Sequence, residues 1–200
     1  KVITGHTVAE ITGMETATGV VLDNGEEIPC NLVVIAIGVL PRTALARGAE
    51  IKVNRGIVVD RHMATSYPEV YSCGDAAEAY DFIYCANRLT PIWPNAYIGG
   101  RVAGYNMSGV RTEYPGGTAM NSLNYFGLDI ASAGVASLLE SDGCELISKQ
   151  ENGVYQRLVL KDDLIVGMVC VGAVEKAGIL FSLMRERVKV SSFKKMLLSD

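Results

Sequence analysis

Residues 65–78 place the strongest constraint on what this chain can fold into. The dipeptide Tyr67-Pro68 favours an extended backbone, and the apolar run at residues 70–73 is typical of a short β-strand. Gly74 and Asp75 then end that strand. Because Gly74 has no side chain, the backbone there can approach a bound molecule closely, and the Asp75 carboxylate can accept hydrogen bonds from hydroxyl groups.

Small residues follow this strand end. The backbone N–H groups of Ala76 and Ala77 could bind an anion such as a pyrophosphate. A Gly-Asp dipeptide also closes many strands that bind nothing, because both residues are common in turns. Taken by itself, the dipeptide leaves a ligand site and a plain turn both open.

The longer context resembles the FAD-dependent pyridine nucleotide-disulfide oxidoreductases. The second flavin-contacting segment of that family reads Thr-x-x-Pro-x-Val-Tyr-Ala-x-Gly-Asp. The matching residues here are Thr65, Pro68, Val70, Tyr71, Gly74 and Asp75, with Ser72 where the family usually has Ala. In the family the Asp binds the ribityl chain of FAD, so the resemblance implies this role for Asp75.

A helix is predicted from Thr90 to about Met107. Thr90 is a suitable N-cap, and Pro91 suits the first helical position because its missing N–H costs nothing there. Gly100 and Gly104 would lie on one face and allow another backbone to approach.

The resembled family has a helix at this position whose N-terminus points at the pyrimidine edge of the flavin, where the helix dipole stabilises negative charge. Family sequences read approximately Pro-x-x-x-x-Ala-x-x-x-Gly-Arg, which Pro91, Ala96, Gly100 and Arg101 match. The resemblance implies that the amides of Ile92 and Trp93 face phosphate or flavin oxygens. Thr90, Pro91, Ile92 and Trp93 are therefore candidate cofactor-binding residues, together with Gly74, Asp75 and Ala76.

The first 40 residues predict a hairpin that turns at Asn24-Gly25, followed by an apolar run at residues 32–37. This run lacks polar alternation, so it predicts a parallel strand buried on both faces. In the resembled family this segment closes the NAD(P)H-binding domain, which makes Gly38 a further candidate cofactor-binding residue. Arg42 departs from the Asn that usually follows the proline.

No Gly-x-Gly-x-x-Gly loop occurs in the sequence. The resembled family carries two such loops and a redox-active cysteine, all upstream of the region that matches here. We therefore expect a C-terminal fragment whose missing N-terminal half holds the chemistry, and we assign no catalytic residue to the chain.

Residues 113–200 predict an α+β domain. Strands are expected at residues 123–126, 128–135, 145–150, 154–160 and 164–171, followed by a helix at residues 173–187 and a shorter helix capped by Ser191 or Ser192. The strand at residues 164–171 is apolar on both faces, and the helix can cover only one. The other face predicts either a homodimer through residues 113–200, as in the resembled family, or packing against the flavin domain of the same chain.

The predicted fold class is α/β, with part of a Rossmann-like FAD/NAD(P)-binding domain followed by the α+β interface domain. Residues 1–40 would be the remnant of the NAD(P)-binding domain, residues 41–112 part of the FAD-binding domain, and residues 113–200 the dimerisation domain. Within the second part, the chain predicts a short helical piece near Ala44, a strand pair turning at Asn54-Arg55, and a loop at residues 79–84.

Composition excludes several classes of function. The net charge of −4 and the lack of a basic stripe argue against a nucleic-acid binder, and no apolar run is long enough to span a membrane. The five cysteines form neither a zinc pattern nor a Cys-x-x-Cys pair, so we expect no metal and five reduced thiols. These features predict a soluble cytoplasmic protein.

The resemblance implies a flavoprotein oxidoreductase in which NAD(P)H reduces FAD and electrons pass to a disulfide, oxygen or a redox partner. The only histidines are His6 and His62, so the C-terminal His-Glu pair of the glutathione-reductase branch is lacking. The branch of NADH oxidases, coenzyme A-disulfide reductases and nitrite reductase flavin subunits is closer. The alternative is a non-catalytic dimerisation module with remnant flavin-binding segments.

Overall fold

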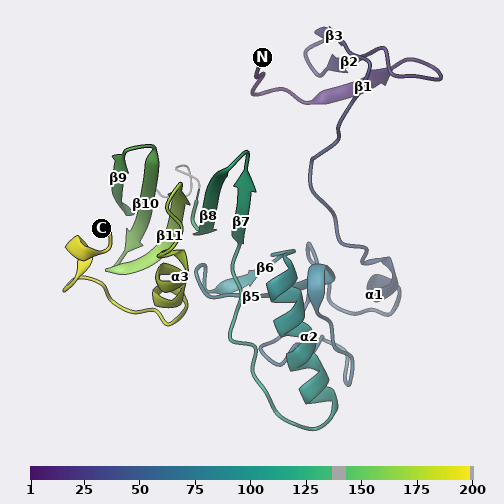
Figure 1. Cartoon of the computed structure of the whole chain (residues 1–200). Helices are drawn as coiled ribbons and strands as arrows, with labels where there is room; N and C mark the ends of the chain where they lie inside the picture. The colour runs from purple at the N-terminus through teal and green to yellow at the C-terminus, as the bar shows by residue number, and fades with distance from the viewer. Residues whose placement is uncertain (137–142, 199–200) are drawn as a thin grey trace. The chain divides into compact units, whose positions relative to one another are not determined.

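The computed structural model describes residues 1–136 and 143–198, and its contacts divide the chain into two units, Lys1–Leu40 and Pro41–Asp200 (Figure 1). Among the described residues, none of the helices has the length and apolar character that crossing a membrane requires.

The first unit is a three-stranded antiparallel sheet in the order β1-β2-β3, formed by Val8–Thr12, Gly19–Leu22 and Glu27–Pro29. The predicted turn at Asn24-Gly25 is confirmed. Gly25 has a φ of 85° and donates its N–H to the Leu22 carbonyl, while the Asn24 side chain accepts a hydrogen bond from the Glu26 N–H. Local turn chemistry therefore determines this hairpin.

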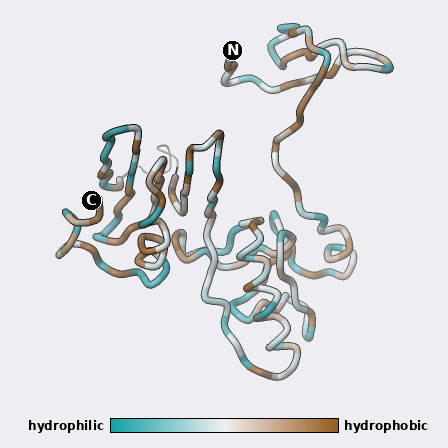
Figure 2. The backbone as a smooth tube through the Cα atoms, viewed as in Figure 1, coloured by the Kyte–Doolittle hydropathy of each residue, from teal (hydrophilic) through white to brown (hydrophobic). Residues whose placement is uncertain are grey.

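The buried strand predicted at residues 32–37 is wrong. The segment has no regular secondary structure, and it is the hydrophobic stretch that follows β3 in Figure 2. Its apolar side chains lie in the open, with Val34 79% and Ile37 90% exposed. A strand of this type needs hydrogen-bonding neighbours on its edges and layers over its faces, and the described residues supply neither.

The second unit begins with a small mixed region. Its helices are α1 (Ala44–Gly48) and α2 (Trp93–Met107), with one 3₁₀ turn, η1 (Gly74–Ala76). Its sheet has the order β4-β5-β6, formed by Ile57–Val58, Ala77–Asp81 and Ala86–Arg88. β4 and β5 are parallel, whereas β5 and β6 form an antiparallel hairpin. The short helix α1 and the turn at Asn54-Arg55 agree with the prediction.

Two predictions around Gly74 are wrong. Residues 70–73 form no strand: their one ladder contact is an isolated bridge between Tyr71 and Ala64. The regular strand, β5, follows Gly74-Asp75 instead of preceding it. The predicted loop at residues 79–84 is the end of β5 and the start of its turn. There Asp81 Oδ1 accepts hydrogen bonds from the N–H groups of Ile83 and Tyr84, at 2.8 and 3.3 Å, so a buried side chain closes the hairpin.

Helix α2 begins at Trp93, later than predicted. Ile92 is the N-cap, with an extended backbone, and Thr90 makes no capping hydrogen bond to the helix. If the helix began at Pro91, Pro94 would occupy the fourth helical position, where a backbone N–H is needed for the first intrahelical hydrogen bond and proline has none. The Pro94 ring also disfavours a helical backbone at the preceding residue, Trp93. Beginning the helix at Trp93 keeps Pro94 in the first turn, where an N–H is not required.

The C-terminal sheet has five antiparallel strands in the order β7-β8-β11-β10-β9. They are β7 (Met120–Tyr125), β8 (Leu128–Gly134), β9 (Glu145–Glu151), β10 (Val154–Lys161) and β11 (Leu164–Val171). The predicted strands are confirmed over their described residues. Tight turns join them, with positive φ at both central residues of Phe126-Gly127, Asn152-Gly153 and Asp162-Asp163, as two-residue hairpins require.

Both helices predicted after the sheet are shorter than expected. Helix α3 spans Ala177–Arg185, and the last predicted helix is only the 3₁₀ turn η2, Lys194–Met196, with Phe193 as its N-cap. Leu180 and Met184 of α3 pack against one face of the sheet, including Met168 and Cys170 of β11.

The opposite face of the sheet is covered at one end by the β5–β6 turn. Val159 and Val166 are buried there, and Ile83 and Tyr84 pack against them. The sequence offered two explanations for the apolar second face of β11. Packing against another part of the same chain is the one that explains why this end of the face is buried.

Glu78 of β5 is 7% exposed and holds the turn before β4. Its carboxylate accepts hydrogen bonds from Asn54 Nδ2 at 3.0 Å and from the N–H groups of Arg55 and Gly56 at 3.1 Å each. Charge-assisted hydrogen bonds to a buried group are stronger than neutral ones. This side chain therefore ties the loop at residues 54–56 to the strand that follows Gly74-Asp75.

Glu78→Gln should lower the free energy of unfolding by about 1.5–3 kcal/mol, because a neutral amide replaces the charged acceptor of three hydrogen bonds and its NH₂ group faces the Asn54 Nδ2 donor. Urea denaturation would measure this. Glu113→Gln is the matched control, since Glu113 is exposed, and should stay within about 0.5 kcal/mol. Equal effects of the two substitutions would contradict the role assigned to Glu78.

Candidate functional site

Packing brings the Gly74-Asp75 turn against the first turn of helix α2. A Cβ atom added at Gly74 would lie 3.9 Å from the Ala96 Cβ, and Gly74 has a φ of 73°. Residues from two separate sequence segments, 74–76 and 93–96, thus border one region. The sequence predicted both segments as parts of one site, and the structure places them side by side.

Close packing of α2 depends on a different glycine from those predicted. A Cβ at Gly99 would lie 3.1 Å from Met63 Cε, and one at Gly100 would lie 3.7 Å from Cys73 Sγ, whereas Gly104 faces open space. The prediction that Gly100 and Gly104 both allow close packing is therefore correct for Gly100 and wrong for Gly104. Gly99 and Gly100 let the helix lie against residues 63 and 73, just before the Gly74-Asp75 turn.

Asp75 is exposed, and among the described residues its carboxylate has neither a hydrogen bond nor an ion pair. It follows Gly74, which leaves the local backbone open to close approach. The Asp75 carboxylate is thus available to accept hydrogen bonds from hydroxyl groups. This arrangement fits a ribityl or ribose ligand.

The predicted anion-binding amides are only partly available. The Ile92 N–H donates to the Thr90 carbonyl at 2.9 Å, so a ligand oxygen would share this donor with Thr90. Thr90 thus acts through its carbonyl rather than as a cap. Trp93 is the first helical residue, and its N–H belongs to the unpaired donors of a helix N-terminus.

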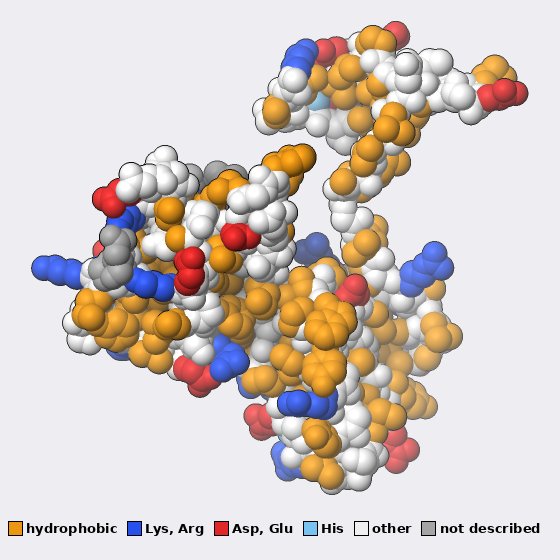
Figure 3. All heavy atoms as spheres, viewed as in Figure 1, with side chains coloured by type: hydrophobic (Ala, Val, Ile, Leu, Met, Phe, Trp, Pro, Cys, Tyr) orange, Lys and Arg blue, Asp and Glu red, His pale blue; other side chains and the backbone are white. Residues whose placement is uncertain are grey.

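The first turn of α2 carries an exposed aromatic pair. Trp93 is 78% exposed and stacks on Tyr97, with ring centroids 5.7 Å apart and planes 18° from parallel. Figure 3 shows hydrophobic side chains over α2. Pro91 is exposed as well. This end of the helix is therefore open to a planar ligand or to another protein surface.

Several residues of the site were not predicted from the sequence. A narrow pocket borders Gly74 and Thr90, and its other lining residues are Met63, Ala77, Ala79, Tyr80, Arg88, Asn95 and Tyr114. Asn95 could have drawn attention as the polar residue in the first turn of α2. Tyr114 could not, because it lies in an irregular segment outside both motifs, and no periodic pattern sets it apart.

A cluster of buried polar groups adjoins this pocket. Asp81 and Thr118 are each 1% exposed, and Asp81 Oδ2 and Thr118 Oγ1 have no hydrogen-bond partner among the described residues. Burial raises the pKa of the Asp81 carboxyl, against the lowering effect of the Ile83 and Tyr84 N–H groups. Burial, and then the charge of Asp81, raises the pKa of Tyr114 to about 12. Tyr114 therefore remains a neutral phenol.

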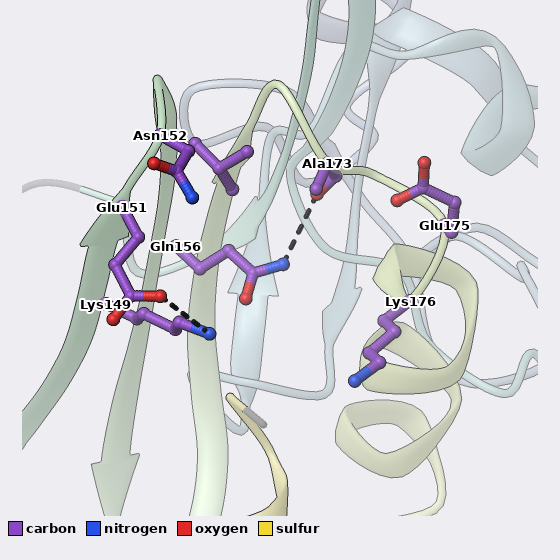
Figure 4. Close-up of a pocket in the computed structure, with 8 residues that line it drawn as sticks. Lys149, Glu151, Asn152, Gln156, Ala173, Glu175 and Lys176 are labelled. Carbon is purple, nitrogen blue, oxygen red and sulfur yellow. Dashed lines mark hydrogen bonds and ion pairs between the residues drawn. The ribbon is translucent and has the colours of Figure 1, made fainter. Parts of the chain in front are cut away.

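A second, larger pocket lies in the C-terminal sheet domain, between strands β9 and β10 and the loop before α3 (Figure 4). Lys149 and Glu151 form an ion pair of 3.2 Å there, and Gln156 donates to the Ala173 carbonyl at 3.4 Å. Its lining holds charges of both signs and no nucleophile next to a base. Within the described ranges, moreover, no three His, Cys, Asp or Glu side chains gather as metal ligands.

Two family models match the chain. The model described as pyridine nucleotide-disulphide oxidoreductase matches residues 1–97, and that of the rubredoxin NAD+ reductase C-terminal domain matches residues 120–188. The chain belongs to the pyridine nucleotide-disulphide oxidoreductase family. This confirms the family predicted from residues 65–75 and 91–101.

Individual members of the family show the same relationship. Nitrite reductase [NAD(P)H] of Bacillus subtilis is 30% identical over 188 residues, which are 94% of this chain and 23% of that protein. An NADH oxidase of Streptococcus pneumoniae is 33% identical over 132 residues, or 66% of this chain and 28% of that protein. The chain thus spans about a quarter of the length of these relatives.

The fold recurs in solved structures. A NAD-dependent persulfide reductase from A. fulgidus superposes with a TM-score of 0.79 at 25% identity, covering 95% of this chain and 39% of that one. The predicted α/β fold class of a FAD/NAD(P)-binding oxidoreductase with a C-terminal α+β domain is therefore confirmed.

Asp81→Asn should remove a pH dependence of stability. Because burial raises the folded-state pKa of Asp81, its contribution to stability is fully present below the unfolded pKa and is lost as the pH rises through the folded pKa. The Asn variant lacks this loss, so its unfolding free energy relative to the wild type should be higher at about pH 7 than at about pH 4.

Urea unfolding at the two pH values would measure the difference. Asn121→Ala is the control, because Asn121 is exposed and carries no titratable group, and its stability difference from the wild type should be the same at both pH values. A pH-independent difference for Asp81→Asn would contradict this account.

Proposed function

We propose that the chain is part of a flavoprotein oxidoreductase in which NAD(P)H reduces FAD and electrons pass on to a disulfide, oxygen or a redox partner. The observation that carries this proposal is the meeting of the Gly74-Asp75 turn with the first turn of α2. The family to which the chain belongs supports it.

In this proposal the FAD site uses residues from both segments. Asp75 would accept hydrogen bonds from the ribityl hydroxyls, Gly74 would allow close approach, and the Ala76 N–H would face a phosphate oxygen. The Trp93 N–H, at the positive end of the α2 dipole, would face a flavin oxygen and stabilise negative charge on the reduced ring. When bound, FAD would supply the hydride acceptance and electron transfer that side chains lack.

Residues 1–40, with Gly38, would contribute to the NAD(P)H-binding domain, residues 41–112 to the FAD-binding domain, and residues 113–200 to an interface domain. The match of the oxidoreductase model to residues 1–97 supports the first two assignments. The glycine loops and the redox-active cysteine of the family would come from a longer polypeptide. The exposed apolar segment at residues 32–40 supports this, since such a surface is ordinarily buried in a native protein.

A cytoplasmic location also remains a proposal. All five cysteines are free, which suits a reducing compartment.

The proposal predicts that a longer polypeptide, which also carries the glycine loops of the family, retains FAD partly through Asp75. Asp75→Ala should raise the dissociation constant for FAD at least about tenfold, because it removes hydrogen bonds to a charged acceptor. Flavin absorbance that remains with the protein after gel filtration gives the first measurement, and fluorescence titration gives the affinity.

Asp129→Ala is the matched control for an exposed carboxylate outside the site, and it should leave the affinity unchanged. Equal affinity of the wild type and Asp75→Ala would contradict the role of Asp75. If the 200-residue chain alone retains no flavin, these two segments do not suffice as a site and the glycine loops of the longer polypeptide are needed. If the longer polypeptide retains none either, the alternative of a non-catalytic dimerisation module gains support.

We further propose a homodimer through residues 113–200. Part of the sheet face opposite α3 remains exposed, where Leu123 and Tyr125 of β7 and Leu128 of β8 are 39%, 60% and 39% exposed. These residues are cross-strand neighbours, because Leu123 pairs with Ile130 and Tyr125 with Leu128. A continuous apolar patch of this kind fits a second copy of the same face.

Leu123→Lys should shift the protein toward monomer, because burying an unpaired charge in the interface is costly. Analytical ultracentrifugation over a concentration series would measure the change, which should be an at least roughly tenfold weaker dimer. Ile179→Lys is the control, since Ile179 is 64% exposed on α3. A wild type that is monomeric throughout, or equal weakening by both substitutions, would overturn the dimer proposal.

A further inference from the structure

The segment that joins the two parts of the second unit is a buried strap. Residues 116–118, here called the strap, have no regular secondary structure beyond a bridge, yet all three are buried. The Gly117 N–H donates to the Tyr80 carbonyl at 3.0 Å, and the Phe82 N–H donates to the Gly117 carbonyl at 3.1 Å. The strap thus pairs with β5 in parallel at Asp81, and the chain continues from it into β7.

Asn95 connects this strap to helix α2. Its side-chain amide donates to the Thr118 carbonyl at 3.3 Å and to the Thr90 carbonyl at 3.4 Å. A single side chain in the first turn of α2 therefore contacts both the strap and the segment that leads into the helix.

The contact between Asn95 and the strap is tight. A Cβ added at Gly117 would lie 2.5 Å from Asn95 Oδ1 and 2.5 Å from the Tyr114 hydroxyl oxygen. These distances are too short for any side chain, so only glycine allows Asn95 to sit where it does. Movement of the strap would consequently displace Asn95.

We propose that Asn95 is a positioning residue through which the C-terminal sheet domain holds the first turn of α2. The strap is continuous with β7 at one end of that domain, and it is hydrogen-bonded to β5, which follows the Gly74-Asp75 turn. A shift of the sheet domain would thus reach the N-terminus of α2 through one side chain. The consequence for cofactor affinity rests on the proposed FAD site, whereas the mechanical coupling does not.

Amide hydrogen exchange tests the coupling without any cofactor. Asn95→Ala and Asn95→Leu both remove the amide donor, and the second keeps the size of the side chain. Each should speed exchange of the amides at residues 96–98, the first that are hydrogen-bonded within the helix, at least about fivefold, the factor expected for the loss of one hydrogen bond of about 1 kcal/mol. Exchange at residues 103–107 should be unchanged.

Asn106 provides a matched control on the same helix. Its side-chain amide donates to the carbonyls of His62 and Thr112 at 3.0 and 2.8 Å, at the other end of α2. Asn106→Ala should speed exchange in the last turn and leave the first turn unchanged. If Asn95→Ala and Asn106→Ala affect both ends alike, the helix responds as a whole and the proposal is overturned.

Gly117→Ala tests whether Asn95 transmits a change in the strap to helix α2 or stabilises only its own turn of the helix. This substitution keeps the Asn95 side chain, but the added methyl group would displace it from its position against the strap. The rate of amide exchange in the first turn of α2 should therefore also rise. In the double variant with Asn95→Ala, the two effects should be strongly non-additive, because both act through one contact. Additive effects, or no response of residues 96–98 to Gly117→Ala, would overturn the proposal. If Gly117→Ala does not fold, unchanged exchange at residues 96–98 in Asn95→Leu is the result that rejects it.

FAD titration of the same variants separates this proposal from the proposed function. If the wild type binds FAD, the Asn95 variants should bind it about fivefold more weakly, matching the loss of one hydrogen bond. Absence of FAD binding by a polypeptide that also carries the glycine loops would count against the proposed function alone, because the exchange measurements judge the coupling independently.

Discussion

Strand β5 carries two buried carboxylates, and the arrangement of the second unit depends on their hydrogen bonds. Glu78 binds the loop at residues 54–56, and Asp81 closes the turn that leads into β6. Burying a carboxylate is costly unless donors match its oxygens; Glu78 meets this condition with three hydrogen bonds, whereas Asp81 meets it at Oδ1 alone. These two side chains therefore specify how the chain enters and leaves the strand that follows the Gly74-Asp75 turn. The strap pairs with the same strand at Asp81.

The candidate site is a consequence of this framework. With β5 held in place, η1 lies against helix α2, and glycines at positions 99 and 100 allow the close approach. The exposed Asp75 carboxylate and the N-terminus of α2 then border one region. A carboxylate that accepts from hydroxyl groups and a helix end that attracts negative charge are complementary to different parts of one dinucleotide-like ligand. This complementarity is the physical basis of the proposed FAD site.

Both the family relationship and the exposed apolar segment at residues 32–40 agree with the proposal that this chain is part of a larger protein. The chain spans about a quarter of the length of its relatives in B. subtilis and S. pneumoniae. Its apolar segment at residues 32–40 is as hydrophobic as a buried parallel strand, but it joins no sheet among the described residues, and most of its apolar side chains are exposed. In the proposed function, the strands and helices that would cover this segment belong to the rest of a longer polypeptide.

The sequence by itself determined the family, the residues of the Gly74-Asp75 turn and most of the C-terminal sheet. Those features are local: turns such as Asn24-Gly25 and Asn152-Gly153 depend on the backbone preferences of two residues, and a family motif is read directly. Only the tertiary structure decided where α2 begins, that β5 and β6 form a hairpin, that the apolar run at residues 32–37 forms no strand, and that Asn95 meets the strap. Each of these depends on a partner distant in sequence, and neither periodicity nor local propensity contains that information.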